Sequence, residues 1–314
     1  MTQVTLKRTT LIVRDAERMM RFYRDVLGWR VDYQSNMKLS GGIIPGGKPG
    51  DEVKLIIMEG ADKEIAKIGL LEWVNPRLPD PGPVRSRLGI GDIVLVADVP
   101  NMTELVKKIE AFPGAVIHSA PKDGAFPDPR GAGEIQYSSM AFFDPEGFFY
   151  ETYFRYNRPN PETFLIRRTT HIVRDIDKTL EFFSNTLGLP KIQDSTMQIE
   201  GMLAAGKAGD TVRFAVCKCQ DDYIGMAAAL QFVKDTLPDP GEATWAYGIG
   251  RALFVAGTDD AHSLFAKVKA SGVKVTREAF ERAVPKSGGV GETKMISMGF
   301  HDPDGMVWEV NHRL

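Results

Sequence analysis

The chain has 314 residues and a formal net charge of −2, from 39 Lys and Arg against 41 Asp and Glu. This balance gives no reason to expect a nucleic acid or an anionic membrane as partner. Apolar residues make up 43% of the chain, enough to bury a core, and neither a membrane-spanning apolar run nor a signal peptide stands out, so we expect a cytoplasmic protein.

The N-terminal stretch predicts one strand, one helix and then three more strands. LKRTTLIVRD alternates and is rich in Thr, Ile and Val, which predicts a strand over residues 6–14. Asp15 is the expected N-cap of the helix that follows, and Gly28 is its expected C-terminal stop. WRVDYQ, VKLIIME and IGLLEWV are typical of short strands, and a Gly-rich loop separates the first two.

The same order of elements recurs three more times. DIVLVADV predicts a strand, Asn101 caps a helix after it, and AVIHSA, IQYSSMAFF and FFYETYF predict strands. The third unit opens with THIVRD and a helix from Asp175 to Gly188, and its later strands are expected near 192–199, 211–218 and 226–233. ALFVAG, a helix that stops at Gly272, and the strands VKV, KMISMGF and MVWEVNH form the fourth unit.

The four units arise from a duplication of half the chain. RRTTHIVRD repeats KRTTLIVRD about 160 residues later, with His171 in place of Leu11. LPDPG, GIG and the pair FFDPEGFFYE and FHDPDGMVWE recur at nearly the same offset. We therefore predict two homologous domains with a linker between them. The first domain is 1–155 with units 6–75 and 90–155, the linker is 156–166, and the second domain is 167–314 with units 167–233 and 249–312.

The chain resembles the vicinal oxygen chelate superfamily in its four units, its HIVRD opening and its DPEG or DPDG turn before a strand with Glu. That superfamily includes glyoxalase I, extradiol dioxygenases, fosfomycin-resistance enzymes and bleomycin-binding proteins. The resemblance implies an α+β fold in which four βαβββ modules form two cup-shaped mixed sheets. It also implies that metal ligands come from the first and last strand of each module in a cup.

The resemblance places one candidate residue on the first and one on the last strand of each module. The candidates in chain order are Leu11 and Glu72, Asp92 and Glu151, His171 and Gln231, and Arg251 and Glu309. If modules pair within halves, one cup holds His171, Gln231, Glu309 and the cation Arg251. If they pair across halves, as in tandem glyoxalases, one cup gathers His171, Gln231, Asp92 and Glu151. We favour the second arrangement, in which Arg251 can pair with Glu309 or Glu72 in the other cup.

The favoured set of one imidazole and three oxygen donors suits one divalent metal ion, either Mn²⁺, Fe²⁺, Ni²⁺, Co²⁺, Mg²⁺ or Zn²⁺. Such an ion can bind two neighbouring oxygens of a substrate and stabilise an enolate. Glu151 is the expected catalytic residue, because a carboxylate in the site could detach and carry a proton. The resemblance thus implies a glyoxalase-like isomerase or lyase that acts on a small molecule with vicinal oxygens, as a monomer or homodimer.

Two other functions stay open. The first is a metal-free binding protein of the bleomycin-resistance type, whose cup could be lined by the aromatic residues Trp73, Phe149, Tyr153, Trp245 and Tyr247. The second, a ring-cleaving extradiol-type dioxygenase, is disfavoured because Asp92 or Arg251 stands where that family needs a His. Two local alternatives are that His171 packs in the core and that Asp92 simply closes a turn. We expect Cys217 and Cys219 to be buried thiols.

Overall fold

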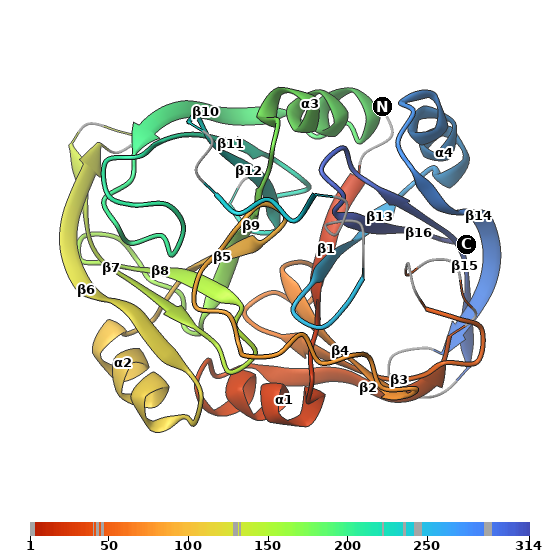
Figure 1. The fold of residues 1–314 in the computed structure, drawn as a ribbon, viewed down its shortest axis with the longest axis horizontal. Coiled ribbons are helices and arrows are strands. Elements are labelled where there is room, and N and C mark those ends of the chain that lie inside the picture. The colour runs from red at the N-terminus through yellow and green to blue at the C-terminus, as the bar shows by residue number, and fades with distance from the viewer. Residues whose placement is uncertain are drawn as a thin grey trace.

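The chain folds into two curled sheets of eight strands each, with the helices packed on their outer faces (Figure 1). This computed structural model describes residues 4–39, 41, 44, 47–127, 131, 133–221, 223–234, 237–241, 247–285 and 291–314. Within those ranges, no helix combines the length and the apolar character needed to cross a bilayer. The predicted fold class, an α+β chain of βαβββ modules in two cup-shaped mixed sheets, is confirmed.

Four modules follow one another along the chain. The first contains β1 (Val4–Ile12), α1 (Ala16–Asp25), β2 (Arg30–Lys38), β3 (Glu52–Glu59) and β4 (Lys67–Asn75). The second contains β5 (Ile93–Asp98), α2 (Met102–Ala111), β6 (Val116–Pro127), β7 (Glu134–Phe143) and β8 (Phe149–Arg155). The third contains β9 (Leu165–Ile172), α3 (Ile176–Glu181), the π-helical turn η1 (Phe182–Thr186), β10 (Lys191–Gln198), β11 (Thr211–Cys217) and β12 (Met226–Phe232). The fourth contains β13 (Ala252–Thr258), α4 (Ala261–Ala270), β14 (Val275–Pro285), β15 (Glu292–His301) and β16 (Val307–Arg313).

Each first helix begins where the sequence predicts it. The side chains of Asp15, Asn101 and Asp175 accept a hydrogen bond from the backbone N–H three residues later, as N-caps do. Gly28 and Gly188 then adopt φ of 75° and 70°, which lets the chain leave the helix in a conformation that glycine favours. The strand–helix geometry of each module is therefore encoded locally.

The modules pair across the two halves of the chain, as we favoured from the sequence. Sheet A has the strand order β14-β15-β16-β13-β1-β4-β3-β2, so it joins the first module to the fourth. Sheet B has the order β10-β11-β12-β9-β5-β8-β7-β6 and joins the second module to the third. The central contacts are antiparallel, with Leu11 opposite Ala252 in sheet A and Ile93 opposite His171 in sheet B.

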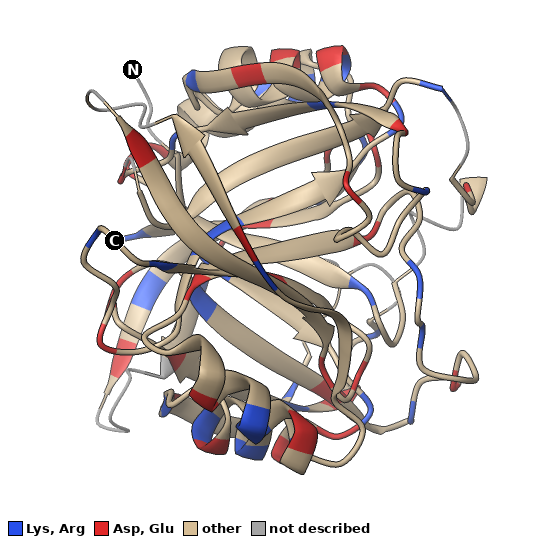
Figure 2. Ribbon diagram, turned by 90° about the vertical axis from the view of Figure 1, so that its left-hand side faces the viewer, with Lys and Arg blue, Asp and Glu red and all other residues tan. Residues whose placement is uncertain are grey.

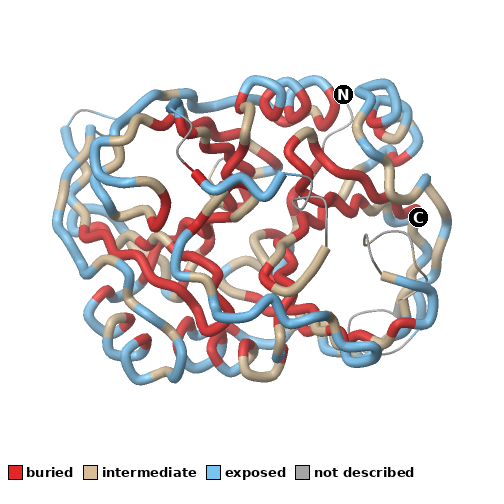
Figure 3. Tube along the Cα trace, viewed as in Figure 1, coloured by how far each residue is buried: buried red, intermediate tan, exposed pale blue. Residues whose placement is uncertain are grey.

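The outer faces of both sheets share one core with the helices, visible as the buried centre of Figure 3. Phe22 of α1 contacts Phe142 of β7, although α1 belongs to the first module, whose strands are in sheet A, and β7 lies in sheet B. The hydroxyls of Thr9 on β1 and Thr169 on β9 lie 2.8 Å apart, so the two central strands meet back to back. The opposite face of each curled sheet is its concave inner face, and we name these inner faces cup A and cup B after their sheets.

Candidate functional site

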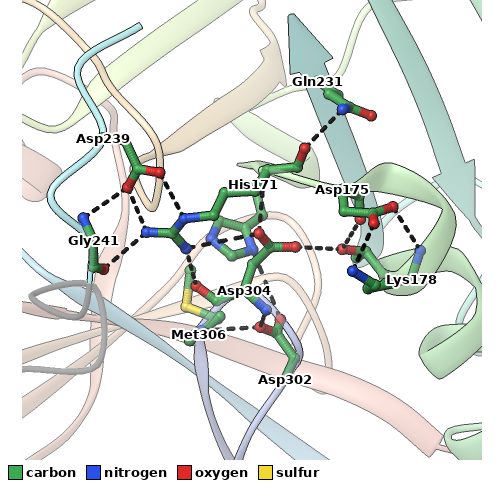
Figure 4. A network of polar contacts seen from close by, with 12 residues as sticks. His171, Asp175, Lys178, Gln231, Asp239, Gly241, Asp302, Asp304 and Met306 are labelled. Carbon is green, nitrogen blue, oxygen red and sulfur yellow. Dashed lines mark hydrogen bonds and ion pairs between the residues drawn. The ribbon is translucent and has the colours of Figure 1, made fainter. Parts of the chain in front are cut away.

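His171 lies on the core face of β9. Its neighbours in register, Ile93 on β5 and Ala229 on β12, belong to the core that the helices share. The ring is fully buried, and its Nδ1 lies 3.7 Å from Oδ2 of Asp302 in the DPDG turn (Figure 4). Neither ring nitrogen has a hydrogen-bond partner among the residues that the structure describes. Strand alternation places His171 away from cup B, where the sequence had predicted it as a metal ligand.

The duplication explains why a histidine occupies this place. In the first half, Tyr23 contacts the hydroxyl of Tyr150, which donates a 3.1 Å hydrogen bond to the buried Asp144 of the DPEG turn. In the second half, the turn η1 that follows α3 carries Phe183 where α1 carries Tyr23, so no hydroxyl comes from this position. His171 lies beside the equivalent turn aspartate, Asp302, which also accepts a 3.3 Å hydrogen bond from Nε1 of Trp308. The exchange of Leu11 for His171 therefore accompanies the loss of a tyrosine.

Gln231 anchors a helix. Its Oε1 accepts a 3.1 Å hydrogen bond from the backbone N–H of Ile176, and its Nε2 donates one of 2.7 Å to the carbonyl of Arg174. Glu72 does the same in the first half, because its carboxylate accepts a 3.0 Å hydrogen bond from the N–H of Ala16. Both side chains satisfy backbone groups at the first turn of a helix, which has no internal partners for them.

Asp92 closes the turn before β5. Its Oδ2 accepts a 2.9 Å hydrogen bond from the N–H of Gly89, and its Oδ1 contacts Arg85 and lies 3.7 Å from Nη1 of Arg251. From the sequence, the partner of Arg251 was open between Glu309 and Glu72; the structure places Arg251 beside Asp92 and pairs Glu309 with Arg282. Arg251 begins its module at the same kind of turn as Asp92, and the two halves bring these turns together.

Glu151 is the one predicted ligand that faces cup B. Register places Glu151 on β8 beside Val96 on β5, and Val96 beside Arg168 on β9, so the three side chains share one row. Val96 belongs to the apolar cluster of cup B. The hydroxyl of Tyr153 donates a short hydrogen bond to the Glu151 carboxylate.

The four predicted ligands are therefore not brought together. Among the described residues, no three His, Cys, Asp or Glu side chains group so that they could hold a metal ion. In cup B the first and last strands present one carboxylate, Glu151, which is already bonded to Tyr153, and beside it the guanidinium of Arg168. Like charges repel, so Arg168 opposes a divalent cation at this place. The residues of cup B do not fit the divalent metal that the sequence predicted.

Arg168 is the functional candidate that sequence reasoning missed. Its guanidinium carbon lies 4.9 Å from the centre of the Phe214 ring in cup B. The side chain makes no hydrogen bond or ion pair with the part of the chain that the structure describes, and its Nε is buried without a partner. Burial, followed by repulsion from Arg167, lowers the pKa of Arg168 to about 10, although Glu151 opposes the change.

Cup A differs from cup B in how its charges are partnered. Arg8, the equivalent of Arg168, donates from Nε to the Thr10 hydroxyl at 3.1 Å. Glu309, the equivalent of Glu151, accepts hydrogen bonds of 2.6 Å from Arg282 and 3.0 Å from Asn311. Burial lowers the pKa of Arg8, and Glu309 opposes this. The polar groups of cup A are thus largely satisfied among themselves.

The wall of cup B is apolar and aromatic. The strands contribute Val94, Phe143, Phe149, Val212, Phe214 and Leu230, all buried. In Figure 2, which faces the side of the molecule that carries sheet B, charged residues gather on the helices above and below, and the strands between are mostly uncharged. Of the aromatic residues predicted to line a cup, Phe149 and Tyr153 contact this cluster, Trp73 and Tyr247 lie in cup A, and Trp245 is outside the described residues.

A signal for Arg168 exists in the sequence. RTT stands before LIVRD in the first half and before HIVRD in the second, and strand alternation puts Arg168 and His171 on opposite faces. Which face of β9 is the inner one depends on where the helices pack. The repeat does not show this. His171 resembles a metal ligand more than Arg168 does, but the face of β9 that enters cup B is the one with Arg168.

Known structures share this fold. Glyoxalase I from Zea mays matches with a TM-score of 0.60 at 18% identity over 99% of this chain and 92% of that one. A variant of the same enzyme matches with a TM-score of 0.64 at 17% identity, over 99% and 94% of the chains. A putative dioxygenase from Bacillus subtilis matches with a TM-score of 0.55 at 18% identity, over 98% and 84%. A comparison with curated proteins finds no match.

A family model matches residues 5–152 and again residues 165–310, which together make up most of the chain. Both matches are to the same model, in agreement with the duplication and with the two pairs of modules. The chain belongs to the Glyoxalase/Bleomycin resistance protein/Dioxygenase superfamily.

Proposed function

We propose that this protein binds a small organic molecule in cup B without the help of a metal ion. The observation that carries the proposal is the donor set that the described residues give the cup: one tyrosine-bonded carboxylate beside a guanidinium whose buried Nε has no partner among them. Family members typically bind a divalent metal, but this set offers a metal one carboxylate and one repelling charge. An apolar concave wall with a few polar groups is the usual form of a small-molecule site.

A second candidate is an enzyme of the glyoxalase type. The fold shared with glyoxalase I favours it, and Glu151 is a carboxylate inside the cup that could carry a proton. Its metal-dependent form, the isomerase or lyase expected from the sequence, would need His171, Gln231 and Asp92 to reach Glu151. Each of these three side chains instead contacts a turn or a helix end, so we place this candidate second.

Elemental analysis and one fluorescent probe separate the two candidates. Protein purified without chelator should contain far less than one metal ion per chain. It should bind one 8-anilinonaphthalene-1-sulfonate in cup B, with the same affinity before and after treatment with EDTA. Ala228→Trp, which fills the floor of cup B, should abolish this binding, and Val255→Trp, which fills cup A, should not.

The opposite results would overturn the proposal. Retention of one metal ion per chain, lost on His171→Ala, would establish the metal site predicted from the sequence. Probe binding that survives Ala228→Trp in a folded variant would place the ligand elsewhere. Circular dichroism of each variant checks that the fold is kept.

A further inference from the structure

We infer that the molecule bound in cup B is a flat aromatic monocarboxylate whose carboxylate pairs with Arg168. This inference rests on the proposed function and names the chemical class of its ligand. It depends on two polar atoms without partners, on the shape of the wall around them, and on the charge of Glu151.

The first step concerns the two unpartnered polar atoms. Arg168 Nε and Thr170 Oγ1 are both buried and find no hydrogen-bond partner in the described part of the chain, and both side chains face cup B from β9. In cup A the equivalent residues, Arg8 and Thr10, bond to each other at 3.1 Å. An unpaired buried charge is costly, and a planar guanidinium binds a carboxylate through two parallel hydrogen bonds. One ligand carboxylate would therefore satisfy both residues.

The second step concerns the space beside them. Thr170 pairs in register with Ala228 on β12, and Glu151 pairs with Ala141 on β7, so the floor next to these polar groups has short side chains. Phe214 lies under the guanidinium, and Phe149 belongs to the same cluster. Aromatic rings bind other rings edge-on or in offset stacks. This wall suits a flat ring that carries its carboxylate toward Arg168.

The third step concerns the number of charges. Glu151 lies in the same row as Arg168, two strands away, and within the described ranges its hydrogen-bond partner is the Tyr153 hydroxyl. Its negative charge balances part of the guanidinium charge and repels a second anionic group on the ligand. The cup should therefore prefer a carboxylate to a phosphate monoester of the same ring.

Calorimetric titration of the full chain with three naphthalene probes tests the inference. The probes are 2-naphthoate, the neutral 2-naphthamide and the dianionic 2-naphthyl phosphate. The carboxylate should bind at least about tenfold more tightly than the other two, as a bidentate charge pair provides. Arg168→Met should remove this preference, and Arg168→Lys should restore part of it, because lysine keeps the charge but not the planar fork.

Two matched variants complete the test. Arg8→Met, the same substitution in cup A, should leave the preference unchanged. Glu151→Gln should narrow the gap between 2-naphthoate and 2-naphthyl phosphate. Equal binding of amide and carboxylate, or a preference that survives Arg168→Met, would overturn the inference while the proposed function stands. Failure of all three probes and of the fluorescent probe to bind would refute the proposed function itself.

Discussion

Removing the unpaired cation of cup B should stabilise the free protein, which is unusual for a substitution in a buried site. Burial lowers the pKa of Arg168 to about 10, roughly 2.5 pH units below the usual value for arginine. The charged form is therefore disfavoured by about 3 kcal/mol at neutral pH. Arg168→Met removes this cost and keeps an apolar side chain against Phe214, but it loses a cation–π contact of about 1 kcal/mol.

We therefore expect Arg168→Met to raise the free energy of unfolding by about 1 to 2 kcal/mol in the absence of ligand. The matched variant Arg8→Met should be less stable than Arg168→Met by about 1 kcal/mol or more, because it also loses the hydrogen bond from Arg8 to Thr10 and the attraction of Glu309, which opposes the burial cost. Urea denaturation followed by tryptophan fluorescence and by circular dichroism measures both values. Equal losses of stability in the two variants would show that Arg168 is a satisfied structural ion, and the reasoning on cup B would fail.

Three further predictions concern the core and cup A. His171→Leu should keep or slightly raise the melting temperature, because the ring nitrogens have no hydrogen bonds; a large loss would show that the contact with Asp302 holds the turn. Burial raises the pKa of Asp144 to about 7, so the stability that its protonated form contributes is complete below about pH 4 and is lost as pH rises through 7. Asp144→Asn should make the free energy of unfolding depend less on pH when denaturation is measured from pH 4 to 8. An unchanged slope would mean that another group causes the pH dependence. Arg282→Met should cost about 3 kcal/mol by urea denaturation, because it leaves Glu309 buried without its cation; a loss within error would show that Asn311 alone suffices.

The fold could be predicted from the sequence because its signals are local and occur twice. The caps at Asp15 and Asp175 and the stops at Gly28 and Gly188 mark the helix limits in both halves. The repeat then gives the order of strands within each module. Pairing across halves followed from the chemistry of the candidate residues, and it holds in the structure even though those residues do not assemble.

The candidate site could not be predicted in the same way, because alternation divides a strand into two faces without saying which one is concave. β9 carries His171 on one face and Arg168 on the other, and both faces are largely buried. Only the packing of the helices against the face of His171 distinguishes them. Gln231 was likewise indistinguishable from a ligand, since its role depends on the backbone of α3 lying within reach.

The order in which the modules pair also constrains how the chain can be made. The partners in sheet B are neighbours along the chain, so this sheet can close as soon as the third module has left the ribosome. In sheet A, β1 waits for β13, with Leu11 opposite a residue about 240 positions later. Until then the first module exposes an unpaired strand edge, and such edges invite association with other chains. During synthesis, the N-terminal module should therefore be the part of the chain that most needs chaperones. Closure of sheet A should be the slow, final step of folding.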